Sequence, residues 1–128
     1  MDQYRAKTQT ALEDILNRIV ADGDYEAALL SDEDGLPLAA TATGDSAAML
    51  AAMAGLFHNS ATQASRRLNL SYINELSLVG DDRFRLVCRF FETASGQSLG
   101  LVAIVPPDHA YRRITNRAIR EIKEAWAG

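Results

Sequence analysis

The segment LLSDEDGLPLAAT, residues 29–41, holds the side chains whose types and spacing most readily suggest chemistry. Its centre, Asp32-Glu33-Asp34-Gly35, could be a calcium loop, a phosphate-binding loop or a tight turn. An EF-hand calcium loop needs alternating oxygen ligands and a closing glutamate, and the residues after Gly35 supply neither. A phosphate loop needs several glycines and a following helix, whereas an apolar strand follows here. An Asp-Gly pair between two apolar runs instead predicts a β-hairpin turn.

The two histidines and the single cysteine do not form a recognisable reactive set. His58 and His109 lie far apart in the sequence, and no HExxH, GxSxG or CxxC motif occurs. Cys88 shares one face of an apolar strand with hydrophobic residues, which predicts a buried, inert thiol. We therefore predict no catalytic, metal-binding or cofactor-binding residue and expect the protein not to be an enzyme. A hydrolase or transferase site assembled from remote residues is an alternative that this motif search leaves open.

Composition and charge narrow the functional classes further. The 128 residues are 48% hydrophobic and 23% charged, which is typical of one globular domain over residues 1–128. The net charge of −4 gives no bulk field that attracts nucleic acid or an anionic membrane. No apolar run approaches the roughly 20 residues of a membrane-spanning helix. We expect a cytoplasmic protein with no nucleic acid and no membrane as partners, and the 11 arginines and 21 alanines suggest a bacterial genome.

Hydrophobic periodicity predicts three helices, and these are expected near residues 3–21, 45–68 and 109–126. Asp45 and Asp108 are the expected N-caps of the second and third helices, and Gly23 is the expected left-handed residue after the first. Shorter apolar or alternating runs predict five strands, at residues 25–31, 36–41, 72–80, 83–92 and 99–105.

The order of these elements, α-β-β-α-β-β-β-α, predicts a single α/β (α+β) domain. Short turns between the strands favour antiparallel neighbours. Pro37 cannot donate a ladder hydrogen bond, which favours an edge position for the second strand. The run LGLVAIV at 99–105 is apolar on both faces, which predicts a central strand covered on each side.

The middle helix carries more apolar surface than one sheet requires. Ten of the twelve residues from Ser46 to Phe57 are apolar, and one stripe of them suffices to cover a sheet. Met49, Met53 and Leu56 begin a second stripe, and their small or flexible neighbours suit close packing against another helix. We interpret this stripe as a subunit interface, with burial inside the monomer as the alternative.

Four stretches together resemble the Roadblock/dynein-light-chain-7 family over about residues 8–126. They are LLSDEDGLPLAAT, AAMLAAMAGLF, RLVCRFF and LGLVAIVP followed by a final helix. The resemblance implies a five-stranded antiparallel sheet with the first and last helices on one face and the long middle helix on the other. It also implies a dimer of this chain with itself or with a paralogue.

In the family the middle helices pack on each other and the third strands pair. Carried onto this chain, the resemblance implies a dimer interface formed by Met49, Ala52, Met53, Leu56, Tyr72, Asn74, Leu76 and Leu78. It further implies a non-catalytic adaptor that binds a small Ras-like GTPase and modulates its activity or location, with the nucleotide held by the partner. A small-molecule-sensing or scaffold domain without a GTPase partner is the alternative, and no residue is singled out as an arginine finger.

Overall fold

A computed structural model describes residues 2–82 and 84–126 of the chain. Within these residues, three helices and five strands follow one another in the predicted order. Their bounds are α1 (Asp2–Gly23), β1 (Ala27–Asp32), β2 (Pro37–Ala40), α2 (Gly44–Leu68), β3 (Glu75–Val79), β4 (Arg85–Glu92), β5 (Ser98–Ile104) and α3 (Arg112–Ala125).

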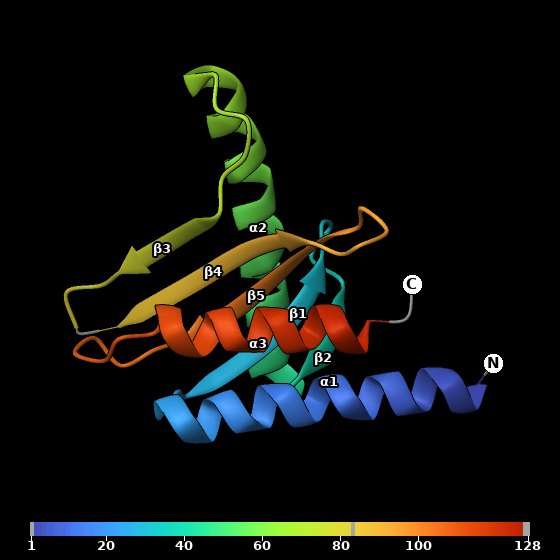
Figure 1. The fold of residues 1–128 in the computed structure, drawn as a ribbon. Coiled ribbons are helices and arrows are strands. Elements are labelled where there is room, and N and C mark those ends of the chain that lie inside the picture. Colours follow the sequence, from blue (N-terminus) through green and yellow to red (C-terminus); the bar gives the residue numbers. More distant parts are fainter. Residues whose placement is uncertain (1, 83, 127–128) are drawn as a thin grey trace.

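The strands form one open antiparallel sheet in the order β2-β1-β5-β4-β3 (Figure 1). The central position of β5 is confirmed, and residues 99–103 of this strand are buried. The edge position of β2 is also confirmed, and Pro37 begins this strand, where its missing N–H costs no ladder hydrogen bond. The opposite edge of the sheet is β3.

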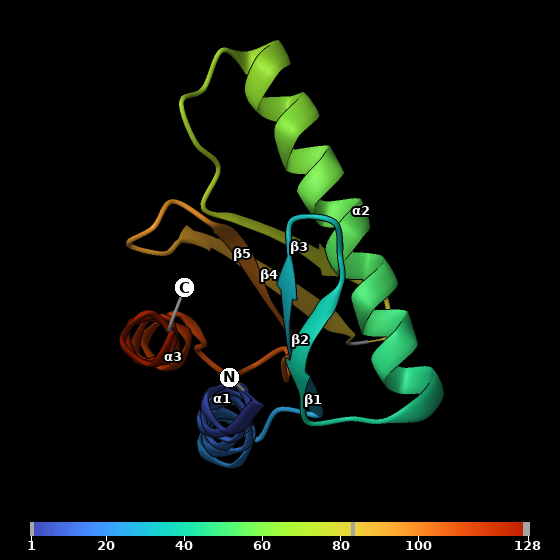
Figure 2. The same ribbon diagram turned by 90° about the vertical axis from the view of Figure 1, so that its right-hand side faces the viewer.

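Each face of the sheet has its own hydrophobic cluster, because side chains alternate between the faces along every strand. α1 and α3 lie side by side on one face, and α2 lies alone on the other, as expected (Figure 2). The first cluster includes Leu16, Ile19, Leu30, Val87, Leu101 and Ile122. The second includes Leu29, Leu50, Ala54, Phe57, Leu86, Cys88 and Phe90.

The predicted N-caps of α2 and α3 are wrong. Thr43 is the N-cap of α2, so Asp45 lies inside the first turn, where its charge still favours the positive end of the helix. α3 begins only at Arg112. Asp108 instead lies in a tight turn, in which the His109 N–H donates to the carbonyl of Pro106 at 3.2 Å.

The residue that ends α1 in the left-handed conformation is Asp24, with φ of 55°, and not Gly23. A short polar side chain such as that of Asp tolerates this conformation better than most residues do. Gly23 is constrained by packing, since a Cβ atom there would lie 2.3 Å from the ring of Tyr25.

α2 is longer than the part of the sheet that it covers. Its buried residues are Leu50, Ala54, Phe57 and His58, and none lies beyond position 58. The last turns extend past the sheet (Figures 1 and 2), and Leu68 at the end of the helix is 65% exposed. The first part of α2 therefore belongs to the core of the monomer, and the rest projects from it.

Candidate interaction surface

The described residues contain no cluster of metal-binding side chains, and their one cysteine is buried. No group of three His, Cys, Asp or Glu side chains among residues 2–82 and 84–126 could hold a metal ion. Cys88 is buried as predicted, and burial raises the pKa of its thiol to about 12, so that the reactive thiolate is disfavoured. None of the helices in this part of the chain has the length and hydropathy needed to cross a bilayer.

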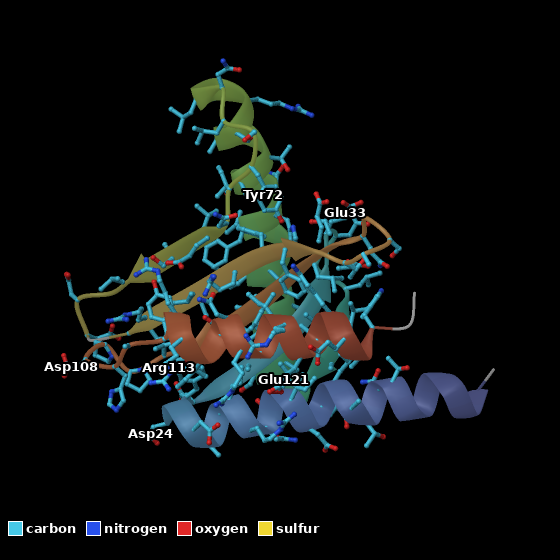
Figure 3. The ribbon with its side chains drawn as sticks, viewed as in Figure 1. Asp24, Glu33, Tyr72, Asp108, Arg113 and Glu121 are labelled. Atoms are coloured by element: carbon cyan, nitrogen blue, oxygen red, sulfur yellow. The ribbon has the colours of Figure 1, made fainter. Side chains whose placement is uncertain are left out.

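The acidic segment is a hairpin turn, as its sequence predicts. One carboxylate oxygen of Asp32 accepts hydrogen bonds from the N–H groups of Asp34 and Leu36, at 2.9 and 3.0 Å. Gly35 has a φ of 87°, a conformation that glycine adopts without steric cost. Glu33 lies at the tip of this turn (Figure 3). One of the three acidic residues therefore builds the turn, and the other two are exposed.

The turn is held directly against α2. A Cβ atom on Gly35 would lie 2.9 Å from the Ala51 carbonyl oxygen and from backbone atoms of Gly55. A Cβ atom on Gly55 would in turn lie 3.3 Å from the carbonyl oxygen of Asp34. Two facing glycines thus allow the hairpin and the helix to approach at backbone distance, which fixes their relative position.

The second stripe of α2 is largely exposed. Met49 and Leu56 are 44% and 54% exposed, Ala52 is exposed, and Met53 is partly buried against the cluster beneath the helix. Burial of Met49 and Leu56 within the monomer, the alternative interpretation of this stripe, is therefore wrong. Large apolar side chains are left on the surface beside one another, a pattern typical of interaction sites.

β3 offers a free edge of the sheet. At one end of β3, the carbonyl of Asn74 accepts a hydrogen bond from the N–H of Phe90, and at the other end the N–H of Gly80 donates to the carbonyl of Phe84. Because hydrogen-bonded residues alternate along an antiparallel strand, the even-numbered residues of this segment bond to β4. The intervening residues therefore direct their N–H and C=O groups to the open side; they are Glu75, Ser77 and Val79.

The predicted interface residues of the third strand occupy different positions. Leu76 is partly buried in the same cluster as Met53, whereas Leu78 is 47% exposed. Tyr72 and Asn74 precede β3, which is shorter than the predicted strand, and both lie on the segment that connects α2 to β3. Tyr72 and Asn74 are exposed there. The eight residues thus fall on one helix and one adjoining edge segment, and their role as an interface stays a prediction.

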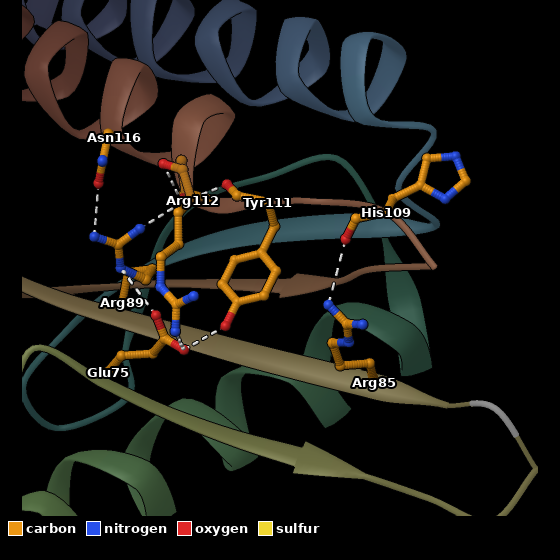
Figure 4. A network of polar contacts seen from close by, with 8 residues as sticks. Glu75, Arg85, Arg89, His109, Tyr111, Arg112 and Asn116 are labelled. Carbon is orange, nitrogen blue, oxygen red and sulfur yellow. Dashed lines mark hydrogen bonds and ion pairs between the residues drawn. The ribbon is translucent and has the colours of Figure 1, made fainter. Parts of the chain in front are cut away.

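Polar contacts fasten β3 to the opposite helix layer. Glu75 is bonded by the Tyr111 hydroxyl and forms ion pairs with Arg89 and Arg112 at 3.6 and 3.5 Å (Figure 4). The Arg89 guanidinium also donates to the side chains of Thr115 and Asn116, at 2.6 and 2.7 Å. The edge strand is therefore held rigidly at its start, and the Arg89 side chain is engaged within the monomer.

The sequence profile of the Roadblock/LC7 domain matches residues 11–94, which is more than half of the chain. The chain belongs to the Roadblock/LC7 family. This family match confirms the resemblance given by the four sequence stretches. No curated protein sequence matches the chain.

Solved structures similar to this Roadblock/LC7 chain include two from named bacteria. The gliding protein MglB of Thermus thermophilus has a TM-score of 0.71 at 17% identity, with 92% of this chain and 90% of that chain covered. MglB of Myxococcus xanthus has a TM-score of 0.70 at 15% identity, with 90% and 86% covered. An MglB described in a tetrameric arrangement has a TM-score of 0.71 at 17% identity, with 92% and 89% covered. At such identities these likenesses establish the fold.

Sequence reasoning missed several exposed apolar side chains near the predicted interface. Val79 at the end of β3 is 72% exposed, and Leu70 after α2 is 48% exposed. Leu68 continues the helical spacing of the buried residues of α2, and its exposure arises because the helix has by then passed the sheet. Helical periodicity indicates which way the Leu68 side chain points, but it does not indicate where the sheet beneath the helix ends.

Proposed function

We propose that this Roadblock/LC7 chain is a non-catalytic dimeric adaptor that binds a small Ras-like GTPase and modulates its activity or location. The observation that carries the proposal is the exposed stripe of Met49 and Leu56 on α2, together with the free edge that β3 gives the sheet. Family membership favours this use, because Roadblock-type proteins serve as scaffolds and regulators of small GTPases. An MglB of the same fold is described in a tetrameric arrangement, which supports self-association as a property of such domains.

One symmetry operation satisfies both exposed features. A two-fold axis normal to the sheet at the β3 edge pairs β3 with its copy in antiparallel fashion. The same axis places the second α2 on the same face of the enlarged sheet, alongside the first. The stripe on α2 and the open N–H and C=O groups of β3 are then buried together. A dimer with a paralogue follows the same arrangement.

The chemistry of GTP hydrolysis belongs to the partner in this proposal. An arginine supplied in trans must reach the transferred phosphate. Arg89 is held by Glu75, Thr115 and Asn116 within the monomer, so it does not serve this purpose. Arg66 and Arg67 are exposed in the last turn of α2, and nothing distinguishes them from other surface arginines.

The dimer is tested by Leu56→Asp, which places a charge in the proposed contact without touching the core of the monomer. Burying an unpaired charge costs about 2 kcal/mol or more, so the dimer dissociation constant should rise at least about thirtyfold. Ala48→Asp is the matched control, because Ala48 is exposed on α2 outside the stripe. Analytical ultracentrifugation measures the result, and equal dimerisation of the two variants would exclude this stripe as the interface.

The GTPase partner is tested with purified Ras-like GTPases encoded in the same genome. Each is loaded with GDP or with a non-hydrolysable GTP analogue and titrated with the full chain in a calorimeter. We expect at least one to bind, with an affinity that depends on the nucleotide. Absence of binding for every such GTPase in both nucleotide states would refute the proposal.

A further inference from the structure

A cleft lies between the acidic hairpin turn and α2, next to the stripe of Met49 and Leu56. It has a volume of ≈ 640 Å³. The turn contributes Glu33, Asp34, Gly35 and Leu36, and the helix contributes most of the opposite wall. Leu36 and Leu56 are 62% and 54% exposed at this cleft, so it combines two apolar side chains with two carboxylates.

The charge of this cleft has one sign. Glu33 and Asp34 are its acidic side chains, and no lysine or arginine lines it. Neither carboxylate forms an ion pair with any residue in the described parts of the chain. The larger cleft between β4 and α3 differs, because Arg120 and Lys123 line it together with Glu92 and Glu124. The cleft at the hairpin therefore carries acidic side chains with no basic residue in its lining.

Two buried polar atoms near the cleft have no hydrogen-bond partner among the described residues. His58 lines it and is 8% exposed, and its Nε2 atom is buried with no hydrogen-bond partner. Ser31, fully buried on β1 beneath it, has an unpartnered hydroxyl oxygen. Both atoms approach Gly100, where a Cβ would lie 2.7 Å from Nε2 and 3.3 Å from the serine oxygen. Buried polar groups are normally satisfied, so these two atoms at Gly100 mark one unsatisfied polar position beneath α2.

The cleft is also preformed. Its two walls meet where Gly35 and Gly55 touch at backbone distance, and the turn is braced by two hydrogen bonds to Asp32. A fixed cavity binds a ligand without the entropic cost of ordering its own walls. Carboxylates at the mouth of the cleft also suit the planar, many-donor guanidinium group.

We infer that this cleft receives an arginine or lysine side chain of a protein partner, with an adjacent apolar residue of that partner lying on Leu36. The cation pairs with Glu33 and Asp34 at the mouth. The inference rests on the proposed function in one respect, since the GTPase is the partner that would present this side chain. It locates the surface that contacts the partner on the hairpin flank of α2, where Leu56 marks its border with the dimer stripe.

The test uses N-acetyl-arginine amide as the probe and the full chain labelled with ¹⁵N. We expect saturable chemical-shift changes at the amides of Gly35, Leu56 and Asn59, which surround the cleft. N-acetyl-citrulline amide, which is uncharged and of similar shape, should leave them unchanged. The double variant Glu33→Gln, Asp34→Asn should weaken probe binding about fivefold or more, because it removes two charge-assisted contacts.

The control variant removes two carboxylates from the other cleft, Glu92→Gln with Glu124→Gln. It should bind the probe as the parent does. His58 supplies a second readout, because burial lowers its pKa and the carboxylates of the acidic turn offset that effect in part. A cation bound between the carboxylates should lower the pKa of His58 further. Equal weakening in both double variants, or a pKa of His58 that the probe does not move, would overturn the inference.

Failure of this inference and failure of the proposed function give different results. If the probe binds at the cleft and no Ras-like GTPase binds the chain, the cleft stands and the GTPase proposal fails. If a GTPase binds the parent and the Glu33→Gln, Asp34→Asn variant equally, the proposed function stands and the cleft is not the contact.

Discussion

The two faces of the sheet are buried in different ways. One face is covered by α1 and α3, and the other is covered by α2. On the first, two helices pack on each other and on the sheet, and ion pairs such as Arg18–Glu121 and Arg117–Asp22 join them. On the second, one helix covers the sheet with half its length and projects beyond it with the rest (Figure 1). The helices of the first face are packed together within one chain, whereas the helix of the second leaves Met49, Leu56 and Leu68 in solvent.

This difference separates the residues that stabilise the monomer from those that are available for contact with another chain. A side chain on the closed face has its partners inside the monomer, so its substitution changes the free energy of unfolding. A side chain on the outer flank of α2 or at the free edge of β3 has few such partners. Its substitution should instead change association, and variants on the two faces therefore give opposite signatures.

The largest expected effect is on the closed face, with Ile122→Ala in α3. Ile122 is fully buried in the cluster shared with α1, so its truncation leaves a cavity and should lower the free energy of unfolding by about 2–5 kcal/mol. Leu68→Ala, in which a 65% exposed side chain is truncated, should cost less than about 0.5 kcal/mol in the monomer. Denaturant titration at one fixed protein concentration measures both, and similar losses would contradict the contrast between the faces.

Most of the closed face could be predicted from the sequence. The stripes of α1 and α3 and the alternation along β4 are short-range patterns that a single segment expresses by itself. The errors on helix ends have a common cause, because Asp45, Asp108 and Gly23 each have the right chemistry one to four residues from the true boundary. The conformational preference of a single residue does not determine at which of several neighbouring positions a helix begins or ends, because the packing of the adjoining loop also affects that position.

The next effect concerns the open edge, with Ser77→Pro in β3. The N–H of Ser77 points to the free side, so proline should leave the monomer folded and remove one donor from each copy at the proposed strand pair. Two lost hydrogen bonds should weaken the dimer by about 1–3 kcal/mol. Leu76→Pro is the contrasting variant, because Leu76 bonds to β4 and its replacement should destabilise the monomer itself. Ultracentrifugation with circular dichroism separates the two outcomes, and an unchanged dimer in Ser77→Pro would argue against strand pairing.

Less of the contact surface could be predicted from the sequence than of the fold. The second stripe on α2 could be predicted from the helical periodicity of the sequence. Because a single sheet covers only one side of the helix, the stripe is left exposed. The cleft beside the acidic turn was not visible, since it depends on Gly35 meeting Gly55 across twenty residues of chain. The acidic run was correctly interpreted as a turn. A role for the carboxylates of Glu33 and Asp34 can be inferred only from the part of α2 that packs next to the turn.

The smallest expected effect is a pH dependence that originates beneath α2, at His58. Burial lowers the pKa of this imidazole below its ordinary value of 6.5, and the nearby acidic turn offsets burial only in part. Between the two pKa values the unfolded chain binds the proton more readily than the folded one, so the free energy of unfolding falls as the pH falls below about 6.5. The contribution of one imidazole cannot exceed about 1.4 kcal/mol per pH unit, and the loss ends once the pH is below the folded-state pKa.

Replacing His58 by glutamine should remove this part of the slope, and His109→Gln, at an exposed histidine, is the control for the loss of an imidazole. For the parent and for each variant, the slope is the difference between the unfolding free energies measured at about pH 7.5 and about pH 5.5. These two pH values lie on either side of the ordinary histidine pKa. A His58→Gln variant with the same slope as the parent would mean that protonation of this residue is not coupled to folding. A reduced slope would show that even the partly open face of the sheet encloses a polar group that water does not reach, because desolvation is the largest cause that lowers the pKa of this imidazole.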